Sequence, residues 1–229
     1  MAKTAAARPA SRKQAPKRTE SLTDKAYSVL EEMVVTLRLE PGEVLSEIAL
    51  SQQLGIGRTP IREALQRLAR EGLVTILPRK GILVSDINPR KQLLLLEVRR
   101  ELERLIARSA AQRATPEERA TFKAIAEGIE KASSEKDDIA FMRYDDELNK
   151  LMALAAHNEY ANRAIGLMHG LSRRFWYMHY KETADLPLTA RLHAQLARAI
   201  SEGDAEGAGQ ASDKLVDYVE AFTRATVSA

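Results

Sequence analysis

Two arginines and a glutamine, Arg58, Arg62 and Gln66, follow one another at intervals of four residues. On a helix this spacing places both guanidinium groups and the amide on one face. Thr59 can cap such a helix, and Pro60 suits its first position. The other face repeats apolar residues at i, i+3, i+4 and i+7 and is expected to be buried: Ile61, Ala64, Leu65 and Leu68. This pattern is typical of a helix that enters the major groove of DNA, although a solvated surface helix has a similar composition.

The elements on either side of this helix must position it. Ser46 to Leu54 is predicted to form a preceding helix with Ile48, Ala49, Leu50 and Leu54 as its apolar positions, and Gly55-Ile56-Gly57 is a tight turn. Together they predict a helix-turn-helix. Two β-prone runs follow, Leu73 to Leu77 and Ile82 to Val84, joined by the turn Pro78-Arg79-Lys80-Gly81. A hairpin with a basic tip is a wing, so we expect Arg79 and Lys80 to reach phosphates or a minor groove.

The stretch from Pro41 to Val84 resembles the DNA-binding domain of the GntR family of bacterial transcription regulators. The residues that carry the resemblance are Pro41-Gly42, Leu45, Glu47, Leu54-Gly55, Arg58-Thr59-Pro60, Arg62-Glu63-Ala64-Leu65, Leu68, Glu71-Gly72-Leu73 and Gly81. Two positions depart from it: Gly57 stands where the family usually has Ser, and Ile48 where some relatives have a DNA-contacting basic residue. The resemblance implies DNA contacts by Arg58, Thr59, Arg62, Gln66, Arg79, Lys80 and Gly81.

Composition limits the classes of function. The 229 residues include no cysteine, which excludes disulfides, thiolate metal sites and a cysteine nucleophile. No apolar run approaches the roughly 18 residues of a membrane span, and the basic N-terminus lacks a secretory h-region. Residues 1–84 carry 14 Lys and Arg against 9 Asp and Glu, and residues 85–229 carry 21 against 23. Positive charge therefore collects beside the helix-turn-helix, as nucleic-acid binding requires, and a soluble, cytoplasmic protein is expected.

The predicted fold is mainly α, with an N-terminal winged helix-turn-helix and an all-α antiparallel bundle of six to seven helices. We expect a disordered basic tail over residues 1–20, a DNA-binding domain over 21–85 that begins with a helix from Leu22 to Leu37, and a helical domain over 90–227. Polar breaks place the bundle helices near 90–113, 115–134, 137–156, 158–181, 188–202 and 204–226.

The helical half resembles the FCD domain, the effector-binding half of the FadR-type branch of the GntR family. The resemblance rests on Arg99 with Leu102-Glu103, on Asp145 to Asn158, and on Arg191 to Ala208. Many FCD domains hold a divalent metal (Zn²⁺, Ni²⁺ or Mn²⁺) with one Asp and three His. Here Asp145 and His193 match two ligands, Asn149 stands at the first His position, and Leu215 stands at the third. Two interpretations stay open: a metal on Asp145, Asn149 and His193, or a metal-free pocket in which these side chains bind a polar effector or one another.

Arginines complete the predicted effector site. Arg99 lies on the first bundle helix, and a buried arginine needs an anion, either an effector carboxylate or Glu103 at i+4. Arg173 and Arg174 are adjacent and must point in different directions, so we expect one to enter the pocket and the other to face solvent. We assign Arg99, Asp145, Asn149, His193 and Arg174 to effector binding.

These patterns predict a ligand-responsive transcription regulator and not an enzyme. We expect a homodimer that represses from a double-stranded, pseudo-palindromic operator, is released by a small organic acid, and has no membrane partner. One alternative is an architectural DNA-binding protein without an effector. Another is a metal-dependent enzyme in the bundle, which the incomplete ligand set and the absence of Ser-His-Asp, P-loop and dinucleotide motifs argue against.

Overall fold

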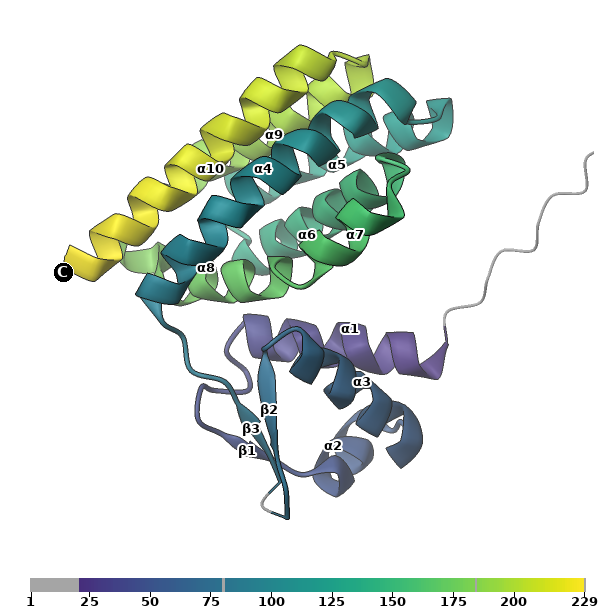
Figure 1. The fold of residues 1–229 in the computed structure, drawn as a ribbon, viewed down its shortest axis with the longest axis vertical. Helices are drawn as coiled ribbons and strands as arrows, with labels where there is room; N and C mark the ends of the chain where they lie inside the picture. Colours follow the sequence, from purple (N-terminus) through teal and green to yellow (C-terminus); the bar gives the residue numbers. More distant parts are fainter. Residues whose placement is uncertain (1–20, 80, 184, 229) are drawn as a thin grey trace, which may run out of the picture.

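The computed structural model describes residues 21–79, 81–183 and 185–228, and it contains two hydrophobic cores (Figure 1). One core lies in the N-terminal part and one in the helical part. The predicted tail over residues 1–20 and the wing residue Lys80 lie outside the described residues. Among the described helices, none is both long enough and apolar enough to cross a bilayer.

The N-terminal part, the head, has the order helix, short strand, helix, helix and hairpin. Its elements are α1 (Leu22–Val35), β1 (Val44–Leu45), α2 (Glu47–Leu54), α3 (Arg58–Arg70), β2 (Val74–Leu77) and β3 (Gly81–Val84). The strands form an antiparallel sheet in the order β1-β3-β2, with Val74 opposite Val84 and Leu45 opposite Ile82. The apolar face of α3 is fully buried against α1, so its polar face is turned outward.

Two local predictions in the head are wrong, and one strand was not predicted. The helix α3 begins at Arg58 with Gly57 as its N-cap and without a side-chain cap, so Thr59 lies inside the first turn. Ile48 is 52% exposed, because only one stripe of the short helix α2 faces the core, and that stripe contains Leu50. The strand β1 was missed because its two residues are too few to show an alternating pattern.

The helical part consists of antiparallel helices joined by short turns. Its elements are α4 (Pro89–Arg113), α5 (Pro116–Glu135), α6 (Asp138–Ala155), α7 (Glu159–Gly166), α8 (His169–Thr183), α9 (Leu186–Glu202) and α10 (Ala205–Ser228). Side-chain caps start several of them, including a complete capping box between Thr115 and Glu118. The helix α10 lies along α4, and α5 lies along α9. The predicted winged helix-turn-helix followed by a helical bundle is thus confirmed.

The helix predicted over 158–181 is in fact two helices. The helix α7 ends at Gly166, and the N–H groups of Leu167 and Met168 bond three residues back, to Ala164 and Ile165. This tightened turn re-aims the chain before α8 starts at His169. Neither a proline nor a polar cluster marks the break, so spacing alone did not reveal it.

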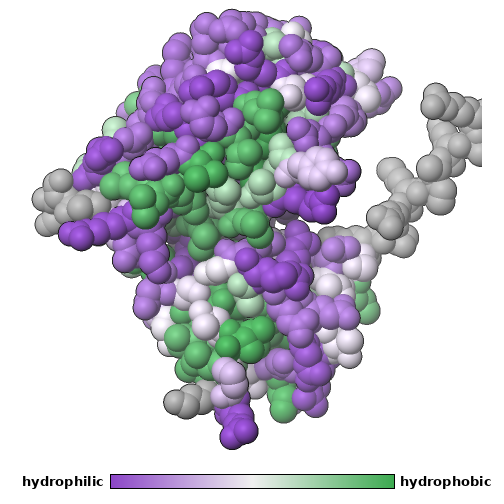
Figure 2. All heavy atoms as spheres, viewed as in Figure 1, coloured by the Kyte–Doolittle hydropathy of each residue, from purple (hydrophilic) through white to green (hydrophobic). Residues whose placement is uncertain are grey.

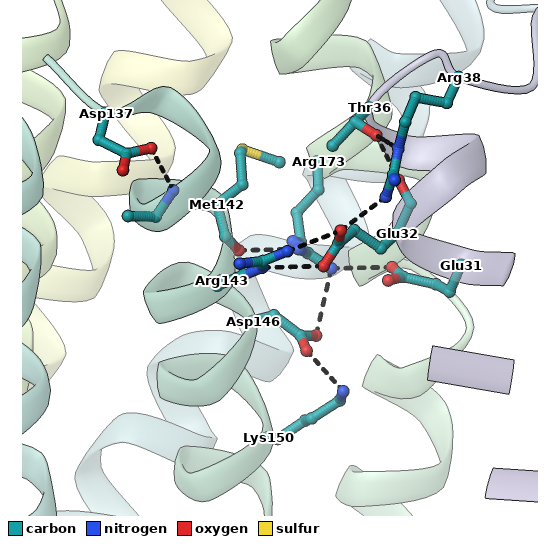
Figure 3. A network of polar contacts seen from close by, with 11 residues as sticks. Glu31, Glu32, Thr36, Arg38, Asp137, Met142, Arg143, Asp146, Lys150 and Arg173 are labelled. Carbon is teal, nitrogen blue, oxygen red and sulfur yellow. Dashed lines mark hydrogen bonds and ion pairs between the residues drawn. The ribbon is translucent and has the colours of Figure 1, made fainter. Parts of the chain in front are cut away.

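The helix α1 joins the two parts, because it packs on α3 and also on α8 (Figure 1). Its residue Val35 belongs to the core of the bundle, and Leu171 of α8 packs against the core of the head. Gly170 permits this approach, since a Cβ atom there would lie 2.9 Å from Leu73 Cδ1. A network of ion pairs, centred on Arg173, surrounds the same contact (Figure 3).

Candidate functional site

The first candidate site is the groove between α3 and the wing. Arg58, Arg62 and Gln66 are exposed on α3, as their spacing predicts. Together with Arg79 and Gly81 of the hairpin they line a groove of about 580 Å³, closed on its third side by the start of α2. The structure therefore brings together the predicted residues of the two elements, while Thr59 is exposed beside this groove and is not part of its lining.

The hairpin owes its shape to backbone conformation at two residues. Gly81 has φ +104°, and a Cβ atom there would lie 3.3 Å from Val44 Cγ1, so a side chain would be strained and crowded against β1. Arg79 also has a positive φ of 63° and is exposed at the tip. Gly81 is thus needed for the turn that presents Arg79, and its role is to position the tip.

Arg62 is held in place by an acidic residue of α2. Its Nε lies 3.0 Å from Glu47 Oε1, and its Nη2 lies 2.8 Å from Glu47 Oε2, while its side chain remains 54% exposed. The hydrogen bonds from Arg62 lower the pKa of Glu47. The fork geometry fixes the guanidinium across the groove before any ligand arrives. Sequence spacing gave no signal for this pair, because the partners lie 15 residues apart on different helices.

Arg67 lies on the opposite side of α3 and faces α1. Its guanidinium carbon lies 3.6 Å from the centre of the Tyr27 ring, and its Nε lies 3.2 Å from Glu71 Oε1. These contacts attach α3 to α1, so Arg67 has a structural role although it is on the same helix as Arg58 and Arg62.

The second candidate site is a small polar pocket inside the bundle. Arg99, Asp145, Asn149 and His193 line it as predicted, together with Arg173 and Trp176 of α8 and with residues that the sequence did not single out: Phe141, Met142, Ser172, Thr189 and Val219. Its volume of about 40 Å³ holds little more than one water molecule. As it stands, the pocket is filled by its own side chains.

Asp145 is the centre of the pocket. His193 Nε2 lies 3.1 Å and Asn149 Nδ2 3.0 Å from its Oδ1, and Arg173 Nε lies 3.0 Å from its Oδ2. Burial alone would raise the pKa of Asp145, but the hydrogen bond from His193 and the positive charges nearby lower it well below the ordinary value. Burial would lower the pKa of His193, but Asp145 and the carbonyl oxygen of Thr189, 2.8 Å from Nδ1, raise it overall.

Arg99 has an internal partner. Its Nε lies 2.8 Å from Glu103 Oε1, and it also donates to Ser172. Burial works to raise the pKa of Glu103, but the charge of Arg99 and a contact from His169 lower it to about 2. An effector carboxylate and Glu103 were the two anions considered for Arg99, and in the structure its partner is Glu103.

The adjacent arginines of α8 correct the sequence assignment. Arg173 enters the pocket, whereas Arg174 turns toward the connection between head and bundle, where it donates to the carbonyl oxygens of Leu73 (3.4 Å) and Asp86 (3.0 Å). The expectation that one of them faces solvent is wrong, since they are 8% and 1% exposed. Arg174 is therefore not part of the bundle pocket.

The pocket does not fit a divalent metal. The amide nitrogen of Asn149 points at Asp145, so its oxygen is the more distant atom, and a guanidinium already occupies the second carboxylate oxygen. Leu215 supplies no donor atom at the remaining position. Among the described residues, no three His, Cys, Asp or Glu side chains gather closely enough to hold a metal ion.

Two family models match the chain. Residues 22–84 match the model of bacterial regulatory proteins of the gntR family, and residues 94–218 match the FCD domain. The HTH-type transcriptional repressor RspR of Escherichia coli strain K12 is 25% identical over 206 residues, which is 90% of this chain and 90% of the relative. The Nta operon transcriptional regulator of Aminobacter aminovorans is 40% identical over 91 residues, 40% of this chain and 43% of the relative.

The relatives of higher identity match only part of this chain, 28% to 40% of its length. The chain spans 27% to 43% of the length of the three that are 40% identical or more. The solved structure of E. coli McbR/YncC has a TM-score of 0.77 at 21% identity, and the match covers 90% of this chain and 99% of that one. At this identity the likeness establishes the fold.

The buried pair of His193 and Asp145 predicts a dependence of stability on pH. A histidine whose pKa is raised in the folded state stabilises the fold fully below the ordinary value of 6.5, and this contribution is lost as the pH rises through the folded value. We expect the free energy of unfolding of the bundle to fall as the pH rises above the ordinary histidine value of 6.5, and His193→Gln to flatten this slope. Denaturant titrations at a series of pH values, followed by circular dichroism, measure the free energy of unfolding.

The exposed His157 provides the control for this experiment. His157→Gln should keep the slope of the wild-type protein, because its side chain is 51% exposed. A slope unchanged in His193→Gln would show that the pair with Asp145 does not exist in solution.

Proposed function

This chain belongs to the GntR family of bacterial regulatory proteins and combines a gntR-type DNA-binding head with an FCD domain, and on that basis we propose that it is a repressor which a small organic acid releases from its operator. The family and its relatives are DNA-binding transcription regulators and not enzymes. The observation that carries the proposal is the groove in which exposed Arg58, Arg62 and Gln66 of α3 face the tip of the wing.

In the proposed complex, α3 lies in the major groove. Arg58, Thr59, Arg62 and Gln66 contact base edges and nearby phosphates, and Arg79 with Lys80 contact the backbone or the minor groove. The fixed orientation of Arg62 supports direct contact with a base, since a guanidinium that is already ordered loses little entropy on binding. Binding to chromosomal DNA places the protein in the cytoplasm.

The proposed effector competes with Asp145 in the bundle pocket. Arg99, Arg173 and His193 supply positive charge there, and Asp145 and Glu103 currently neutralise it. A carboxylate from a small organic acid has the same chemistry as Asp145 and can replace it once the pocket opens. This supports an anionic effector over a neutral one, and a sensing role over that of an architectural protein without effector.

Arg173 connects this pocket with the head. The same guanidinium that contacts Asp145 lies 2.8 Å from Glu31 Oε1 on α1 and donates to the carbonyl oxygen of Met142 (Figure 3). An effector that draws Arg173 away from Glu31 weakens the attachment of the head to the bundle. The heads of a dimer then occupy a different range of positions, and fewer of these match the spacing of two half-sites.

We propose that the dimer forms through the bundle. Hydrophobic side chains gather along α4 and continue toward α7 on the face shown in Figure 2. Leu94 (63%), Val98 (49%) and Leu105 (48%) of α4 are exposed. Leu154, in the last turn of α6, and Leu167, at the C-terminal end of α7, are also exposed. An apolar stripe of this kind, outside the core, is typical of an interface between subunits.

Binding to DNA tests the first part of the proposal. Arg62→Ala should weaken binding to a duplex selected from a random pool by roughly two orders of magnitude or more, because each half-site loses a base contact that contributes ~1–3 kcal/mol. Fluorescence anisotropy measures the affinity. Arg67→Ala, on the far side of the same helix, is the matched control and should bind nearly as well as the wild type. Equal affinity in Arg62→Ala would exclude α3 as the reading helix.

The oligomeric state tests the proposed interface. Leu94→Asp should raise the dissociation constant of the dimer by at least about two orders of magnitude, since each dimer buries two copies of a leucine that contributes ~1.5–3 kcal/mol. Sedimentation at several concentrations measures it. Leu22→Asp changes an equally exposed leucine (63%) on α1 and should leave the dimer intact. If the protein is still a dimer in both Leu94→Asp and Val98→Asp, the interface lies on another surface and the proposal is wrong.

Metal content tests the proposal that the pocket works without a metal. Protein purified without chelator should carry far less than one equivalent of zinc, nickel or manganese by elemental mass spectrometry, because Arg173 already supplies the positive charge beside Asp145. Treatment with EDTA should leave release from DNA by small carboxylates unchanged. One equivalent of metal that disappears in Asp145→Ala would contradict this.

A further inference from the structure

A second cavity lies where the head meets the bundle. It has a volume of about 720 Å³, and its walls come from β2, β3, residues 85–88, the first turns of α4, and α8. This volume is in the range of sites for small molecules, whereas the bundle pocket of about 40 Å³ must open before a ligand enters. We call this cavity the junction cleft.

Arg174 is the buried charged residue of the junction cleft. It is 1% exposed, and its pKa is lowered by burial to about 10, against the attraction of Asp86. Its neighbour Arg173 has three carboxylate partners, whereas the described partners of Arg174 are two backbone carbonyls. A buried guanidinium without a carboxylate is costly, and an anion would relieve that cost.

The other residues that line the junction cleft are of two kinds, charged and apolar. Lys91, on the first turn of α4, is exposed at the edge of the cleft and adds a second positive charge. Ile87, Leu95 and Phe175 supply apolar walls. Asp86 is the carboxylate on the lining and would oppose a bound anion. An anionic group joined to an apolar body matches this combination.

We propose that the junction cleft binds an organic anion whose carboxylate or phosphate pairs with Arg174 and whose apolar part lies against Ile87, Leu95 and Phe175. This site is separate from the bundle pocket and goes beyond the proposed function. Both parts of the chain form its walls, so an occupied cleft fixes the position of the head on the bundle. The rival explanation is that Arg174 is only a clamp, which holds the connection between head and bundle by two carbonyls.

Calorimetry on the full chain without DNA tests this site, so its result does not depend on whether the operator model is right. The probes are 2-naphthoate, 2-naphthyl phosphate and the neutral 2-naphthalenemethanol. At least one anion should bind roughly tenfold more tightly than the neutral probe, because a hydrogen bond to a charged group contributes ~1.5–3 kcal/mol. The tighter anion identifies the head group as carboxylate or phosphate.

Two substitutions should act in opposite directions. Arg174→Gln should weaken binding of the anion by roughly tenfold or more, and Asp86→Asn should strengthen it a few-fold, because the opposing charge is gone. A residue that only clamps the backbone predicts no effect of Asp86→Asn on the affinity. If Arg174→Gln does not fold, Lys91→Gln at the exposed edge takes its place and should also weaken binding.

Two controls locate the bound anion. Arg163→Gln changes an exposed arginine on α7 that pairs with Glu159, and it should not alter the affinity. Asn149→Ala changes the bundle pocket and should also leave the affinity unchanged. The proposal is overturned if neither anion binds, if the neutral probe binds equally well, or if Asn149→Ala and not Arg174→Gln removes binding.

Discussion

The neutralisation of Arg173 is the constraint on which the arrangement of the molecule depends. Its guanidinium is buried, so every partner must come from the protein, and these partners belong to different parts of the chain. Glu31 comes from the head, and Asp145 and Asp146 come from the bundle. Removing one partner from a buried ion pair costs about 3–5 kcal/mol. The position of the head and the closure of the pocket therefore rest on one side chain.

The contact between the head and the bundle can therefore break and form again at little cost in free energy. Burial raises the pKa of Glu31 despite the charge of Arg173, and an acid with a raised pKa stabilises the fold most below its ordinary value of 4.5. A buried ion pair contributes little beyond the cost of burying its two charges. The nearby pair of Arg143 and Glu32 is largely exposed and adds little more. For the effector that we propose, a modest difference in affinity between two head positions is then enough to shift the population.

The periodicity of the sequence predicted the helices and strands, but not the directions in which their side chains point. The polar face of α3 follows from intervals of four residues. The contact of Asn149 with Asp145 follows from the same interval and was one of the alternatives left open. The directions of Arg173 and Arg174 could not be predicted, because adjacent helical residues diverge by about 100° and only the neighbouring helices decide which direction leads to the pocket. The partners Glu47 and Glu31 were missed for the same reason, as they are close in space and distant in sequence.

The bundle pocket shows how one positive charge can take the place of another. The resemblance implies that many FCD domains neutralise the equivalent of Asp145 with a divalent metal, which binds an effector through open coordination positions. Here Arg173 and His193 neutralise Asp145 in directions fixed by their own contacts, with the carbonyl oxygens of Met142 and Thr189. A guanidinium and an imidazole donate hydrogen bonds along definite axes. We therefore propose that an acid that replaces Asp145 is selected by the geometry of its carboxylate and not by its ability to chelate.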